Sequence, residues 1–235
     1  MEHSKRRLAI LIASGIALLQ SAAVPWRSDP KADYILEQMH EKAMRITTIQ
    51  AAIVQVKHFG IGRDPYDEGA MYFKHEGPNK DKVRMTYKRG GEVTQDLLID
   101  GDKMTLYYPR VKQAILTSRS KQARQNPEYD FLAAPYSSVP SLKNRYVTAY
   151  LRDEDDSQHG PVGAAVIQLT PRAESSFKSV TFWIERASSF PVQYRVDEAS
   201  GEFTTLTLTD IKKNGQVAAD AFTLNLPNGT DKIYK

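Results

Sequence analysis

The chain has 235 residues, no cysteine and a formal net charge of +4 at pH 7. The absence of cysteine excludes a disulfide framework and a thioether-linked lipid on the chain itself. So small a net charge does not indicate nucleic-acid binding, for which a strongly basic surface is typical.

Residues 1–23 have the pattern of an export signal. Basic residues at positions 5–7 precede an apolar run over residues 8–19, and residues 21–23 are small enough for a signal peptidase. An uncleaved membrane anchor is the alternative, but the run is far shorter than the ~20 residues that span a bilayer. We expect cleavage at the end of this segment, a mature periplasmic chain that starts at Val24, and a net charge reduced to +2, because one acidic and three basic residues are removed.

Residues 24–235 are expected to form one domain, since all-β barrels and sandwiches commonly reach this length. A helix is predicted to begin at Asp29-Pro30, with Asp29 as N-cap and Pro30 in the first helical position. Apolar residues then recur at helical spacing, at Ile35, Leu36, Met39, Ala43 and Met44. This stripe predicts an amphipathic helix that packs on the rest of the domain.

From Ile49 onward the apolar residues recur every second position, as in a strand. The first strand is apolar on both faces, with Ile49, Ala51 and Ile53 on one and Ala52, Val54 and Val56 on the other. A strand of this kind is typical of a sheet that is covered on both sides. We therefore expect the N-terminal helix to cover one face of this first strand.

The rest of the chain alternates in the manner of successive antiparallel strands. Alternating segments occupy residues 71–73, 83–88, 97–99, 104–108, 111–116, 146–151, 164–169, 180–184, 192–196 and 203–208. Gly90-Gly91 and Asp100-Gly101 supply tight hairpin turns between the early strands. Residues 119–144 break the rhythm with three prolines, and we predict a loop with short helical turns there.

Motifs for catalysis are absent from the sequence. It contains no G-x-S-x-G, glycine-rich phosphate loop or H-E-x-x-H motif. Residues 153–156 with His159 resemble a divalent-metal site, but a solvated turn is favoured because runs of like charge usually face water. We therefore predict no enzyme activity, no cofactor and no metal; an enzyme whose site is assembled from distant loops is the least favoured alternative.

Four stretches, in order, resemble the periplasmic outer-membrane lipoprotein carrier (LolA-like) family. The matching segments are 49–55; 69–74 with Pro78 and 83–87; 97–109 with Gln113; and 169–172, 180–185, 191–192, 201, 214 and 222–229. The resemblance implies a mainly β (α+β) fold, an unclosed antiparallel β-barrel with an N-terminal helix and short helical lid segments. It also implies no cofactor.

The same resemblance implies a function. A carrier of this family takes the acyl chains of lipoproteins into an apolar cavity, receives them from an inner-membrane lipoprotein-releasing transporter and passes them to an outer-membrane receptor. We expect a monomer that acts in this way. The main alternative is a half-barrel protein that binds lipid and senses or regulates through a membrane partner.

Candidate cavity residues follow from the alternation. The apolar phase of consecutive strands carries Met71, Phe73, Met85, Tyr87, Leu97, Ile99, Leu106 and Tyr108. Some of these side chains are expected to line the cavity, where flexible methionines would adapt to varied lipid tails. The alternative is that they are ordinary core residues.

Two residues are candidates for a lid latch. Members of the family often have arginine after the lysine of the second strand, and His75 stands at that position here. If His75 takes the place of a latch arginine, its protonation near the ordinary histidine pKa of ~6.5 would alter lid closure; an exposed strand-end histidine without a role is the favoured alternative. Arg84 matches another basic position of the family, and its alternative is an outward-facing strand residue.

Overall fold

The computed structural model describes residues 27–60, 62, 64–77, 80–122, 136–157 and 160–235. The predicted export signal and cleavage site, Pro78 and His159 lie outside these residues.

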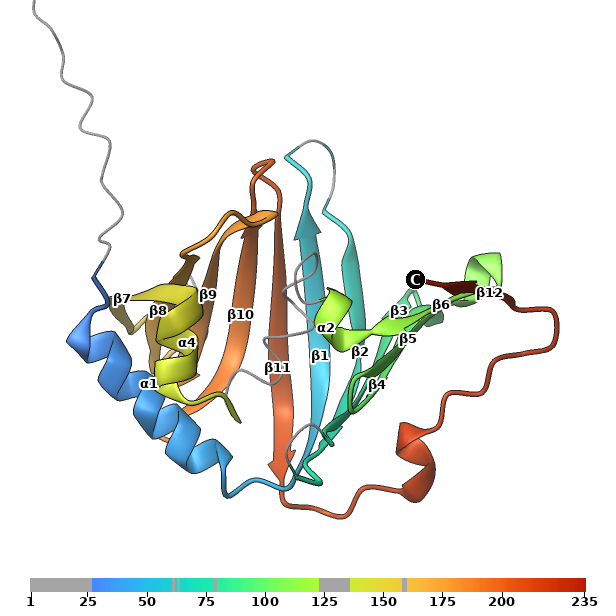
Figure 1. Ribbon diagram of the computed structural model, residues 1–235, viewed down its shortest axis with the longest axis horizontal. Coiled ribbons are helices and arrows are strands. Elements are labelled where there is room, and N and C mark those ends of the chain that lie inside the picture. Colours follow the sequence, from blue (N-terminus) through green and yellow to red (C-terminus); the bar gives the residue numbers. More distant parts are fainter. Residues whose placement is uncertain (1–26, 61, 63, 78–79, 123–135, 158–159) are drawn as a thin grey trace, which may run out of the picture.

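Twelve strands form one unclosed sheet (Figure 1). They are β1 Thr48–His58, β2 Tyr66–Lys74, β3 Lys82–Arg89, β4 Glu92–Asp100, β5 Lys103–Tyr108, β6 Gln113–Ser118, β7 Tyr146–Glu154, β8 Ala164–Pro171, β9 Phe177–Glu185, β10 Phe190–Glu198, β11 Phe203–Lys213 and β12 Asp231–Tyr234. Their order is β12-β6-β5-β4-β3-β2-β1-β11-β10-β9-β8-β7, so β12 and β7 are free edges. Neighbours are antiparallel except β12, which pairs parallel with β6. The predicted fold class is confirmed.

Short helices accompany the sheet. They are α1 Pro30–Ala43, α2 Arg119–Gln122 and α4 Val139–Arg145, with 3-10 turns η1 Pro109–Val111 and η3 Ala219–Phe222. The α1 helix begins as predicted, because the Asp29 carboxylate accepts a hydrogen bond from the Lys31 backbone N–H at 2.8 Å. Met44, predicted in the apolar stripe, is instead the C-cap residue and is 54% exposed.

The prediction that the N-terminal helix covers the first strand was wrong. The α1 helix packs on β7, β10 and α4, at the far side of the sheet from β2 to β6 (Figure 1). Its buried side chains are Ala32, Leu36, Met39 and Ala43. The second apolar face of β1 lines an open groove on the outer side of the sheet, where Ala52 and Val54 are half-buried.

One continuous apolar core lies on the inner, concave face of the sheet. In β3, for example, Val83, Met85 and Tyr87 are buried while the residues between them face outward. The same core contains residues of α1, α4 and every strand from β1 to β5 and β7 to β11. The inner face is therefore filled by side chains from both wings of the sheet.

Gly69 of β2 has no room for a side chain beside β3. A Cβ atom at this position would lie 1.8 Å from the Thr86 carbonyl oxygen and 2.9 Å from its carbon. These are backbone atoms of a paired strand, so they cannot move aside as the end of a flexible side chain would. Glycine is required here by the space available.

We predict that Gly69→Ala lowers the free energy of unfolding by about 2 kcal/mol, because the added methyl group forces β2 and β3 apart. Gly215→Ala is the matched control, since a Cβ at Gly215 would meet nothing within 4 Å. Urea denaturation of both variants measures the difference. Equal stability of the two variants would show that the strands separate without strain.

Candidate functional site

A small apolar hollow lies on the inner face of the sheet. Its volume is about 20 Å³. It is lined by Ile49, Met71, Phe73, Val83, Tyr136, Phe182, Phe190, Pro191, Tyr194 and Leu208. A space of this size has room for about one water molecule, so acyl chains enter only if side chains or the lid move.

The predicted cavity residues all belong to this inner face. Met71 and Phe73 line the hollow itself. Buried positions in the same core are held by Met85, Tyr87, Leu97, Ile99 and Leu106, and Tyr108 is half-buried against it. Which of these side chains contact an acyl ligand stays a prediction.

Tyr136 lines the hollow and packs on the inner side of β2. Its ring stacks on Phe73, with ring centroids 4.8 Å apart, and on His75, with centroids 5.3 Å apart. The Tyr136 hydroxyl donates a hydrogen bond to the Ile46 carbonyl oxygen at 3.2 Å. Burial, and secondarily the Asp81 carboxylate, raise the pKa of Tyr136, so the hydroxyl keeps its proton and remains a donor.

The helices α1 and α4 cover the other wing of the inner face and are joined by a polar network. Asp33 of α1 accepts hydrogen bonds from Thr148 of β7, at 2.8 Å, and from Lys143 of α4. Asp29 adds a bond from the Tyr150 backbone N–H. This part of the lid is therefore fixed to β7 by several partly buried polar contacts.

His75 lies at the edge of the hollow. Its Nδ1 is 2.6 Å from the Asp81 carboxylate, which is also 4.0 Å from the Arg119 guanidinium. The His75 backbone N–H donates to the Thr47 carbonyl oxygen. Through its ring contact with Tyr136, His75 connects the sheet to a residue that lines the hollow.

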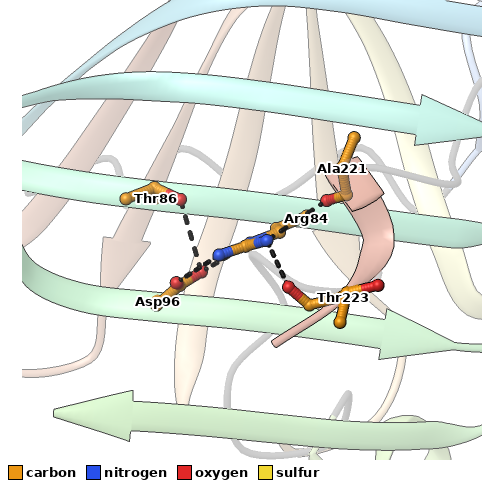
Figure 2. Close-up of polar contacts among 5 residues, drawn as sticks. All are labelled: Arg84, Thr86, Asp96, Ala221 and Thr223. Atoms are coloured by element: carbon orange, nitrogen blue, oxygen red, sulfur yellow. Dashed lines mark hydrogen bonds and ion pairs between the residues drawn. The ribbon is translucent and has the colours of Figure 1, made fainter. Parts of the chain in front are cut away.

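Arg84 lies on the outer face, because its position alternates with the buried Val83 and Met85. Figure 2 shows its contacts with Asp96, Ala221 and Thr223. Its Nε and Nη2 bind the two Asp96 carboxylate oxygens at 3.1 and 2.8 Å, and these bonds raise the pKa of Arg84. Its Nη1 donates to the carbonyl oxygens of Ala221 and Thr223. Arg84 thus holds the segment between β11 and β12 against the sheet and is not a freely solvated strand residue.

A part for His75 or Arg84 in lid movement stays a prediction.

A larger groove of about 1100 Å³ lies on this outer face, between β1 to β3 and the segment that Arg84 holds. Charged side chains from Glu68, Arg84, Lys88 and Asp220 line it beside smaller apolar ones. Because acyl chains gain little from contact with charged groups, the inner hollow is the better candidate site.

The acidic residues 153–156, predicted to form a solvated turn, are partly buried and paired. Glu154 is buried and accepts hydrogen bonds from Arg152 and Trp183, while Asp153 and Asp155 pair with Arg186. Among the residues that the structure describes, no three His, Cys, Asp or Glu side chains come together as metal ligands would.

The sequence did not identify four large side chains that line the hollow. Phe182 and Tyr194 were assigned to strands but not to the cavity, and Phe190 was left between two predicted strands. Period-two alternation placed Phe182 and Tyr194 on an apolar face and could have nominated them. Tyr136 lies in the irregular stretch, where no periodic pattern indicates a direction.

None of the helices that the structure describes is long and apolar enough to cross a membrane.

Comparisons with known proteins agree with the fold. An outer-membrane lipoprotein carrier protein of Chromohalobacter salexigens is 25% identical over 169 residues, 71% of this chain and 70% of the relative. A solved structure of an uncharacterized conserved protein from Thermus thermophilus has a TM-score of 0.53 at 12% identity, covering 87% of this chain and 99% of its own. The structure of MucB has a TM-score of 0.51 at 13% identity, covering 84% of this chain and 64% of its own. At these identities the two structures indicate a shared fold alone.

The family model described as "Outer membrane lipoprotein carrier protein LolA" matches residues 44–225. This match includes every strand of the sheet except β12, and it includes the hollow with Tyr136. The chain therefore belongs to the LolA family of outer-membrane lipoprotein carrier proteins.

Proposed function

We propose that the protein is a periplasmic carrier that binds the acyl chains of lipoproteins in its inner hollow. In this proposal it receives them from an inner-membrane lipoprotein-releasing transporter and delivers them to an outer-membrane receptor. Membership of the LolA family and the lipoprotein carrier among its relatives support this function. The observation that carries it is the continuous apolar inner face, covered by α1, α4 and Tyr136.

The composition of the hollow suits acyl chains. Burial of each methylene group contributes about 0.8 kcal/mol, so an apolar surface binds such chains without specific polar groups. Met71, Met85 and Met104 lie on three different strands of the inner face. Their unbranched side chains change rotamer readily and can make room where the closed hollow has none.

Opening is expected at Tyr136. This residue is held by two ring contacts and one hydrogen bond, whereas α1 and α4 are held to β7 through Asp33 and its partners. Outward movement of Tyr136 would uncover Phe73 and enlarge the hollow. The helical part of the lid would stay in place during this movement.

We predict that Leu106→Asp weakens binding of a triacylated lipopeptide about a hundredfold, because a carboxylate replaces apolar contact and must be desolvated. Thr105→Asp is the matched control on the outer face of the same strand, and it should bind like the parent. Met71→Gln, which nearly preserves side-chain shape, gives a milder test if Leu106→Asp unfolds. Fluorescence titration measures affinity, and thermal unfolding monitors the fold.

Parental affinity in folded Leu106→Asp and in Met71→Gln would show that the ligand does not occupy the inner face. Transfer of bound lipopeptide to acceptor membranes separates a carrier from a lipid-binding sensor. A carrier releases the ligand to the acceptor, whereas a sensor retains it.

We also predict that lid opening is faster in His75→Ala than in the parent, because the variant loses the ring contact with Tyr136 and the contact with Asp81. Stopped-flow association of a fluorescent fatty acid measures the rate. His75→Phe, which keeps an aromatic ring for Tyr136 to stack on, is the control and should open at a rate closer to the parental one. An unchanged rate in His75→Ala would contradict a latch at His75.

A further inference from the structure

A bulge in β11 turns one lysine toward the inner face. Ile53 of β1 pairs with Leu208, and both are buried on that face. Ala52 pairs with Thr209 and Gln50 pairs with Lys212. Two steps along β1 therefore correspond to three along β11, so β11 contains one extra residue. Asp210 in this bulge has a φ of 51°. The extra residue reverses the alternation beyond it.

Lys213 consequently shares the inner face with its partner Ile49, which lines the hollow. The Lys213 Nζ atom lies 4.3 Å from the ring centroid of Phe190, another lining residue. Its neighbour Lys212 is exposed on the opposite face. Lys213 is therefore a half-buried cation at the rim of the apolar hollow.

Lys213 has no ion-pair partner among the residues that the structure describes, whereas Arg84, Arg89 and Lys143 each pair with an aspartate. Burial lowers the pKa of Lys213, and the more distant Glu185 only partly opposes this effect. Packing alone does not explain a lysine that faces inward without a counter-ion. An apolar side chain would fill the same position without the cost of desolvating a charge.

The rim beside Lys213 is also the place where the lid is attached. The next residue, Asn214, accepts a hydrogen bond from the Thr47 backbone N–H and donates one to the Arg45 carbonyl oxygen. The Tyr136 hydroxyl binds Ile46, which lies between these two residues. Figure 1 shows this end of β11 beside the connection from α1 to β1. If Tyr136 moves, a ligand enters next to Lys213.

We propose that Lys213 forms a headgroup subsite that binds the phosphate or carboxylate of an acyl lipid whose chain lies in the hollow. The subsite rests on the proposed acyl-binding function and extends the ligands from lipoproteins to anionic acyl lipids. An ammonium group that is already partly desolvated loses little further hydration when an anion contacts it, and the anion supplies the missing counter-charge.

The test compares three ligands that share one acyl chain: monopalmitoylglycerol, which is neutral, palmitate, and palmitoyl lysophosphatidic acid. The parent is expected to bind the two anionic ligands about tenfold more tightly than the neutral one, as for a hydrogen bond to a charged group. Lys213→Met keeps an unbranched apolar side chain and should bind all three alike, with neutral-ligand affinity unchanged. Lys212→Met, the exposed control, should keep the parental preference.

Each outcome bears on one of the two proposals. A preference for anions that persists in Lys213→Met overturns the subsite and leaves acyl binding intact. Failure of the parent to bind any of the three ligands overturns the proposed function, and the subsite with it. Loss of preference for only one anion supports the subsite and identifies phosphate or carboxylate as its ligand. Thermal unfolding confirms that Lys213→Met is folded, since removal of a half-buried charge should not lower its stability.

Discussion

The structure depends on one constraint: an unclosed sheet with an apolar inner face must keep that face away from water. A closed barrel would fill its interior with its own side chains, but here the sheet ends at β12 and β7. The inner face is covered by α1, α4 and Tyr136, and the hollow that Tyr136 lines holds about 20 Å³. In the proposed function, acyl chains and the lid compete for the same apolar surface.

The two parts of the cover are held by different forces. Asp33 joins α1, α4 and β7 through charged and neutral hydrogen bonds, and α1 also buries an apolar stripe. Tyr136 depends on ring stacking and a single bond to a backbone carbonyl. A site that must both exclude water and admit a long ligand needs such a difference, because the weaker contact opens while the stronger one preserves the fold. On the outer face, Arg84 and Asp96 hold the segment that leads to β12, which keeps that strand on β6.

Alternation along the strands was sufficient to predict successive antiparallel strands and the side chains that share a face, because a period of two directly reports this. The unclosed barrel was predicted from the family resemblance. Met71 and Phe73, which the alternation placed on one apolar face, line the hollow. Prediction failed where the outcome depends on contacts between distant elements or on an irregular backbone. The position of α1 is set by its packing on β7 and β10, which no local pattern records. A period of two continued from Leu208 would place Lys212 on the inner face, and only the bulge at Asp210 brings Lys213 there.

The central claim is that the inner face accommodates acyl chains. Native mass spectrometry of the protein, purified from its producing cells without detergent or organic solvent, tests this claim most directly. The account predicts a population heavier than the chain by the mass of an acylated ligand, which is released as fatty acyl fragments on collisional activation. Detection of the unliganded mass alone, under conditions in which a control lipid-binding protein retains its ligand, would contradict the account.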